Sequence, residues 1–173
     1  HRLVVTFQTI TPGVLFPVDS MPWTYQRYLR LRDMVPAFAT AGFSSWEEYN
    51  LRRTGLPAGA TAQPAERVRA ELVTTSLFPT LGARAMLGRT IAAADSTPSA
   101  TGAVAVLSEP LWRRQFGADS AVLGTVAMLD KLPITIIGVM PASFTGIREN
   151  AEMWVPIKAI NELDAPRRRQ QTE

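Results

Sequence analysis

The stretch VAVLSEPLWRRQFG, residues 104–117, is the part of the sequence that decides the fold. Val104–Leu107 is apolar and partly β-branched, as in a buried strand, and Ser108 and Glu109 follow it directly. The Ser108 hydroxyl can accept a hydrogen bond from an amide one turn into a helix, and Glu109 suits the positive end of the helix dipole. Gly117 permits the left-handed conformation in which helices often end. The stretch therefore predicts a strand, an N-cap, a helix and a C-cap.

Three large aromatic residues, Trp112, Phe116 and Trp154, are candidates for lining a ligand pocket. Trp112 and Phe116 are four residues apart and share one helix face, whereas Arg113 and Arg114 point elsewhere. Aromatic residues at these spacings are more typical of a core. We therefore expect Trp112 and Phe116 to be buried and the two arginines to be mostly exposed.

Ser108 occupies a strand–helix junction where a hydrolase nucleophile could sit. No G-x-S-x-G motif surrounds it, and the only histidine is His1, so no histidine of this chain is placed to activate it. The chain has no cysteine, no G-x-G-x-x-G and no phosphate-binding loop. We therefore interpret Ser108 as a helix cap and predict no catalytic residue, no metal ligand and no cofactor.

Two pairs of carboxylates are candidates for acid–base chemistry: Glu47 with Glu48, and Glu149 with Glu152. Neighbouring residues of a strand point to opposite faces, which separates Glu47 from Glu48. Glu149 and Glu152 flank a loop. Solvation at the surface is the better interpretation of both pairs.

The composition is that of a globular protein, with 173 residues, 46% hydrophobic and 19% charged. The best apolar run, ITIIGVM at 134–140, is far shorter than the roughly 20 residues of a membrane helix, so we expect a soluble chain, whether or not it is a piece of a longer protein. The net charge is +3, and apart from Arg167–Arg169 the arginines are scattered. A nucleic-acid interface needs a denser basic stripe, so nucleic-acid binding is not expected.

The N-terminal third predicts a β-α-β unit, with a strand at 2–9, a helix at 20–36 and a strand at 37–46. Residues 54–65 and 92–103 predict loops because they lack apolar periodicity and are rich in small, polar and turn-forming residues.

The strand predicted at 67–74 alternates between apolar and charged residues, which indicates one buried and one wet face. Ser76 is expected to cap a short helix, LFPTL, that ends at Gly82. The inward residues of the strand are Val68, Ala70 and Leu72, and the outward ones are Arg67, Arg69 and Glu71.

Further along, TVAML and ITIIGVM predict a hairpin, EMWVPI at 152–157 predicts a last strand, and 158–173 is expected to be a polar tail.

Three segments carry a resemblance to a known family: TTSLFPTLGARAMLGRTI at 74–91, VAVLSEPLWRRQFGADSAVLGTVAMLDKLPITIIGVMPASF at 104–144, and EMWVPI. In this order they resemble the MacB-like periplasmic core domain of FtsX-like ABC transporter permeases, and most closely the large permeases of acidobacteria and related phyla. The resemblance spans about residues 18–157. The residues that match family motifs, to which the family gives structural roles, are Phe78, Leu81, Gly82, Gly88, Arg89, Ser108, Trp112, Phe116, Gly117, Gly138, Pro141 and Trp154.

One position departs from the family pattern. Relatives often place Asn-Gly in the hairpin where this chain has Asp130-Lys131. Because lysine tolerates positive φ poorly, we expect a longer turn here.

The resemblance implies an α+β fold with a porter-like β-α-β subdomain and an inserted mixed α/β, sabre-like subdomain. Residues 1–60 would form the first half of the porter-like subdomain and 66–157 the sabre-like one. Residues 158–173 would lead towards a further porter half that lies beyond this chain. An open sheet edge near 2–9 or 37–46 would then favour self-association.

The implied function is that of a periplasmic domain of an inner-membrane permease, which transmits ATP-driven movement of membrane helices to substrate export or extraction. The implied partners are a second permease copy, a cytoplasmic ABC ATPase and a periplasmic adaptor; the domain itself would not be an enzyme. The alternative is an extracytoplasmic module that senses a ligand or partner without a transport role.

Overall fold

The computed structural model describes residues 29–30, 33, 44–55, 64–147 and 150–170 of the chain, of which Trp46 and 164–170 are described by their backbone alone. Leu29, Arg30 and Asp33 are helical, within the helix predicted at 20–36. The predicted strand at 2–9 lies outside the described residues, so the predicted β-α-β unit stays a prediction.

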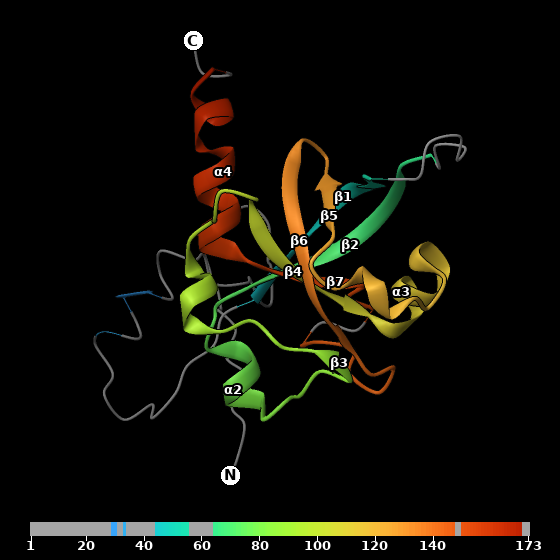
Figure 1. Ribbon diagram of the computed structural model, residues 1–173. Helices are drawn as coiled ribbons and strands as arrows, with labels where there is room; N and C mark the ends of the chain where they lie inside the picture. Colours follow the sequence, from blue (N-terminus) through green and yellow to red (C-terminus); the bar gives the residue numbers. More distant parts are fainter. Residues whose placement is uncertain (1–28, 31–32, 34–43, 56–63, 148–149, 171–173) are drawn as a thin grey trace, which may run out of the picture.

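The described elements alternate between strands and short helices (Figure 1). In chain order they are β1 (Ser44–Arg53), β2 (Glu66–Val73), α2 (Leu77–Leu81), β3 (Leu87–Gly88), η1 (Ala93–Ser96), β4 (Ala103–Ser108), α3 (Glu109–Phe116), η2 (Ser120–Val122), β5 (Val126–Leu129), β6 (Leu132–Met140), β7 (Met153–Pro156) and α4 (Ile157–Gln170).

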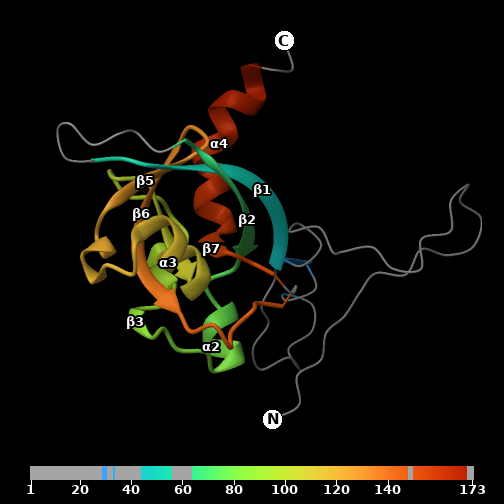
Figure 2. The same cartoon turned by 90° about the vertical axis from the view of Figure 1, so that its right-hand side faces the viewer.

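All seven strands belong to one sheet in the order β3-β6-β4-β7-β2-β1-β5, and β5 also pairs with β6. With β3 set aside at an edge, the other six strands therefore close into a ring. β1 and β2 run side by side along most of their length, as Figure 2 shows. The pairings β2–β7 and β4–β6 are parallel, and the others are antiparallel.

Two apolar clusters lie on the two faces of this sheet. The inner cluster fills the ring and includes residues of α3 and α4, which lie on opposite sides of the strands in Figure 1. The outer cluster lies under α2 and the chain that follows β6. The main members of the inner cluster are Val68, Ala70, Leu72, Ala105, Leu107, Leu111, Trp112, Phe116, Ile134, Ile136, Met153, Val155, Ile157 and Ile160. The buried members of the outer cluster are Val73, Leu77, Phe78, Ile91, Val106, Met140, Ala151 and Trp154.

Strand β2 agrees with the prediction on its inner face but not along the whole of its outer face. Val68, Ala70 and Leu72 are buried in the inner cluster, and Arg67 is exposed. The prediction that Glu71 points to solvent is wrong, because its side chain is fully buried. The alternation pattern indicates a wet outer face, but the outer cluster covers the end of β2.

The hairpin between β5 and β6 is tighter than expected. Leu129 pairs directly with Leu132, so the connection has only two residues, Asp130 and Lys131, and the predicted longer turn is wrong. Asp130 takes the positive φ, at 53°. The Asp130 carboxylate also accepts hydrogen bonds from the backbone amide and the side-chain amide of Asn50, at 2.9 and 2.8 Å, which ties the turn to β1.

Three smaller expectations also change. The Ser76 side chain does not cap α2; its hydroxyl lies 3.1 Å from that of Thr74. The strand predicted at 37–46 is, in its described part, the start of β1, which continues to Arg53. The stretch from 158, expected as a polar tail, is helical as far as Gln170, because α4 begins directly after β7 and buries Ile157, Ala159 and Ile160.

The chain enters and leaves the described sheet at one place. Ser44, the first residue of β1, and Pro156, the last residue of β7, are both register partners of Val73 at the end of β2. Neighbouring strands lie about 4.8 Å apart, so the two connections flank β2 about 10 Å from each other.

Candidate functional site

The three aromatic candidates for a ligand pocket belong to the core. Trp112 and Phe116 are each 8% exposed in the inner cluster, and Trp154 is fully buried in the outer one. The Trp112 indole Nε1 donates to the Asp119 carbonyl at 2.9 Å. The expected burial of both α3 aromatics is thus confirmed.

Helix α3 is capped as its sequence predicts. The Ser108 hydroxyl accepts a hydrogen bond from the Leu111 amide at 3.3 Å, and Gly117 ends the helix with φ 62°. The Arg113 and Arg114 side chains are 61% and 44% exposed, as expected. Ser108 is buried and its hydroxyl oxygen serves the cap, so no observation points to a nucleophile at this junction.

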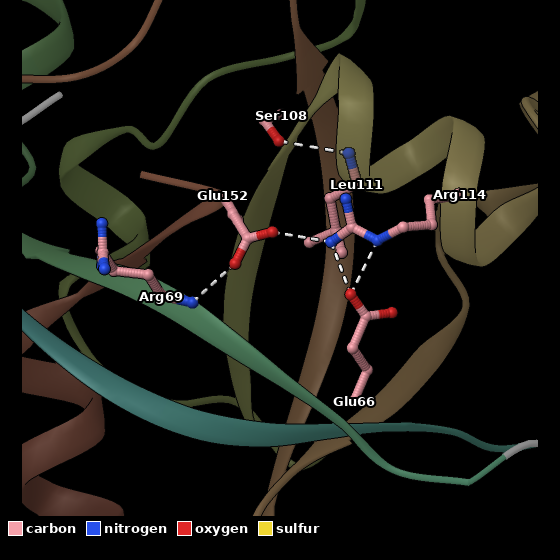
Figure 3. A network of polar contacts seen from close by, with 6 residues as sticks. All are labelled: Glu66, Arg69, Ser108, Leu111, Arg114 and Glu152. Atoms are coloured by element: carbon pink, nitrogen blue, oxygen red, sulfur yellow. Dashed lines mark hydrogen bonds and ion pairs between the residues drawn. The ribbon is translucent and has the colours of Figure 1, made fainter. Parts of the chain in front are cut away.

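Glu152 joins three elements at the start of β7, as Figure 3 shows. One carboxylate oxygen accepts from Arg114 at 2.6 Å and the other from the Arg69 amide at 2.9 Å. Its own amide donates to the Arg69 carbonyl, and its carbonyl accepts from the Ser108 amide. Glu152 therefore has a binding role within the fold, and its interpretation as a merely solvated carboxylate is wrong; Glu149 lies outside the described residues.

Arg114 is the cation of this network. Its guanidinium also contacts Glu66 at the start of β2, with Nε donating at 2.7 Å. The hydrogen bond with Glu66, followed by that with Glu152, raises the pKa of Arg114 above its ordinary value, against the effect of burial. The network therefore holds α3 against the starts of β2 and β7.

A second contact fixes the other end of α3. Glu109 accepts from Arg113, four residues on, and from the amide of Ala142 just after β6. The hydrogen bond from Arg113, together with that from Ala142, lowers the pKa of Glu109. The pair Glu47 and Glu48 is exposed, as expected; Glu47 accepts from Tyr49, and Glu48 from Arg67.

The motif residue Arg89 has a partner that the sequence did not reveal. Both its terminal nitrogens donate to Asp95, at 2.6 and 2.9 Å, and the Ala92 amide donates to the same carboxylate at 2.7 Å. The hydrogen bond from Arg89 is the main reason why the pKa of Asp95 lies below its ordinary value. Asp95 sits in a stretch expected to be a plain loop, where one acidic residue carries no recognisable signal.

Glu71 is the other residue that the sequence placed wrongly. Its Oε2 accepts a hydrogen bond from the Trp154 indole Nε1 at 2.7 Å, and both side chains are fully buried. Phe78 packs against Trp154 with an edge contact, the ring centroids being 6.3 Å apart. The motif residues Phe78 and Trp154 therefore meet on the outer face.

The remaining motif residues lie at turns and at the β3–β6 pairing. Leu81 packs on the outer cluster, and Gly82 ends α2 with φ 63°. Gly88 and Gly138 are register partners, and Pro141 follows directly on β6. The motif residues thus shape the two clusters and their turns and do not converge on one site.

The described residues include no group of three or more histidine, cysteine, aspartate or glutamate side chains that could hold a metal ion. Within the same part of the chain, no helix has the length and apolar character needed to cross a membrane. What the side chains provide is a set of ion pairs and buried hydrogen bonds that link the helices to the ring.

Two solved structures share this fold. The extracellular domain of the noncanonic ABC-type transporter YknZ from Gram-positive bacteria is 17% identical, with a TM-score of 0.60 over 82% of this chain and 66% of that one. The periplasmic region of MacB from Actinobacillus actinomycetemcomitans is 15% identical, with a TM-score of 0.62 over 90% of this chain and 65% of that one. The chain thus spans just under two thirds of either structure.

No curated protein matches the chain in sequence. The model of the MacB-like periplasmic core domain, however, matches residues 3–172, which is nearly the whole chain. It confirms the resemblance carried by the segments from residue 74 to 157, and the mixed α/β fold agrees with it. The chain therefore belongs to the family of MacB-like periplasmic core domains.

Proposed function

We propose that this chain is the periplasmic domain of an inner-membrane ABC transporter permease and that it relays movement of the membrane helices to substrate export or extraction. Family membership supports the location. The observation that carries the relay is the position of the two connections, since Ser44 and Pro156 flank Val73 at one end of the sheet.

The segment before β1 and helix α4 join the sheet at these two adjacent points, so a movement of either segment acts on the same end of the sheet. The six-stranded ring supports this role because each of its strands pairs with two others, which closes the sheet on itself. Helices α3 and α4 bury apolar residues in the ring, and the Arg114 network fastens α3 to it. Movement at either connection would therefore displace the ring as a unit.

In this proposal ATP is hydrolysed elsewhere, by a cytoplasmic ABC ATPase, and this domain has no catalytic task. A second permease copy would supply the opposing domain, and a periplasmic adaptor would receive the movement. The division into porter-like residues 1–60 and sabre-like residues 66–157 is also part of the proposal, although β1 shares its sheet with β2 and β5.

The relay can be tested by spin labelling the full-length permease together with its ATPase. The chain has no cysteine, so cysteines introduced at the exposed residues Ala121 and Lys158 would be the only thiols in this domain. Pulsed distance measurements should show the same Ala121–Lys158 distance within one domain with and without ATP. The distance between the Ala121 labels of two copies should change when ATP binds.

An ATPase variant that cannot bind nucleotide is the control and should abolish the change. Constant distances between the copies in both states would overturn the relay, and would favour a sensing module. A change within the domain would show that the ring deforms and does not move as a unit.

A further inference from the structure

Glu71 and Trp154 form a side-chain hydrogen bond between two strands that are already paired. They are register partners in the parallel β2–β7 ladder, and their Nε1–Oε2 contact of 2.7 Å lies on the outer face. Both side chains are fully buried. The bond therefore adds a second link at the same level of the ladder.

The β2–β7 ladder is shorter than the ladder on the other side of β2. β1 pairs with β2 from Ser44 to Leu51, whereas β7 pairs with β2 only from Met153 to Pro156. Proline has no amide to donate, so the end nearest α4 lacks a donor. Parallel pairing is also slightly less stable for each residue than antiparallel pairing.

The segment 141–147, named the strap here, covers this bond. The Phe144 ring packs against both Phe78 and Trp154, with ring centroids 5.7 and 5.1 Å away. The backbone at Gly146 passes so close to Glu71 that a Cβ there would lie 2.2 Å from Oε2. The strap residues are themselves partly or fully exposed, so the strap is the layer that separates the pair from water.

We propose that the Glu71–Trp154 bond, closed over by the strap, is a lock that holds β7 in register with β2. A slip of one residue would turn Trp154 towards the inside of the ring. A slip of two residues would carry its indole about 6.6 Å from Glu71 and leave a carboxyl group buried without this donor. The mechanical purpose of the lock rests on the proposed function. Helix α4 follows β7 directly, so a pull on α4 acts on β7 and on its pairings with β2 and β4.

The test is amide hydrogen exchange by NMR on the 173-residue chain, comparing Trp154→Phe with Trp112→Phe. Both changes keep an aromatic ring and remove an indole donor, but Trp112 lies in the inner cluster and donates to the Asp119 carbonyl. In Trp154→Phe the amides of Met153–Val155 and of the strap should exchange about ten- to a hundredfold faster. This factor corresponds to the loss of one hydrogen bond to a carboxyl group. The β1 amides from Tyr49 to Leu51 should change much less.

Trp112→Phe should leave the exchange of β7 and of the strap unchanged relative to β1. Equal acceleration of β1 and β7 in Trp154→Phe would overturn the lock, because it would show a general loss of stability. No acceleration in β7 would overturn it too.

Gly146→Ala is a second variant in case Trp154→Phe does not fold. It retains both partners but places a methyl group against Oε2 at a backbone φ of +84°, so we expect the strap to move away from Glu71. Faster exchange confined to the strap and β7 supports the lock. Faster exchange confined to the strap alone overturns it. These readouts need no transporter, so the lock and the relay can fail independently.

Discussion

Gly88 and Gly138 face each other across β3 and β6, and at each of them the backbone of the opposite strand occupies the place of a Cβ. They are register partners. A Cβ on Gly88 would lie 2.3 Å from the Ile137 carbonyl oxygen, and one on Gly138 would lie 2.2 Å from the Arg89 carbonyl oxygen. Two family motifs about fifty residues apart along the chain thus describe one close approach of two strands.

Replacing Gly88 by alanine should lower the free energy of unfolding by about 2–4 kcal/mol, because φ is +70° and the new methyl group meets backbone atoms. Gly82→Ala is the matched control: its φ is +63°, but no atom lies within 4 Å of the added Cβ. The control should lose only about 1–2 kcal/mol. Urea titrations of the two variants measure the difference, and equal losses would contradict the close approach.

Asp95→Asn should lower the free energy of unfolding at pH 7 by about 1–3 kcal/mol, because the Arg89 guanidinium would lose its carboxylate partner. The pKa of Asp95 is lower in the folded state than in the unfolded one. Its contribution is therefore fully present above the unfolded pKa of about 3.9 and is lost as pH falls through the folded value.

Chemical denaturation at several pH values checks this dependence. The wild type and Asp95→Asn should differ at pH 7 and approach each other below about pH 4. A difference that stays constant down to pH 2 would show that the ionised carboxylate is not what stabilises the fold.

Trp112→Ala should destabilise the domain by about 3–5 kcal/mol, since it removes a buried indole from the inner cluster. It also removes the donor to the Asp119 carbonyl. Thermal melting followed by circular dichroism measures the effect. A melting temperature equal to that of the wild type would contradict the role of α3 in the core.

Arg114→Met should cost about 0.5–1 kcal/mol in low salt, because Arg114 pairs with Glu66 and Glu152 but is itself 44% exposed. The cost should shrink in 1 M salt, where the Debye length is about 3 Å. Arg113→Met is the control, with a single carboxylate partner, Glu109, four residues away, and should cost less than Arg114→Met. Equal, salt-independent losses would show that packing of the arginine stems dominates.

The isolated chain should show no hydrolase activity and no saturable binding of ATP. The sequence contains no phosphate-binding loop and no cysteine, and its single histidine is His1. Calorimetry with ATP and turnover assays with ester and peptide substrates check this. Turnover that survives repurification would contradict the proposed function.

Features that depend on neighbours within one helical turn could be read from the sequence. The α3 cap at Ser108, its end at Gly117 and the burial of Trp112 and Phe116 follow from spacing and backbone preference, and the structure confirms each of them. The order of such segments along the chain was also enough to indicate the family, which the family model confirms.

Contacts between distant segments were decided only by the tertiary structure. The alternation in β2 predicts that Glu71 faces solvent, because a period of two does not show what covers the second face of a strand. In the structure that face is covered by the strap, which lies some seventy residues later in the chain, and Glu71 is buried. Asp95 binds Arg89 from a segment that has no apolar periodicity, so the sequence pattern did not indicate this contact. The ring closes because β5 pairs with both β1 and β6, and such pairing is set by side chains that meet in space and are not neighbours in the chain.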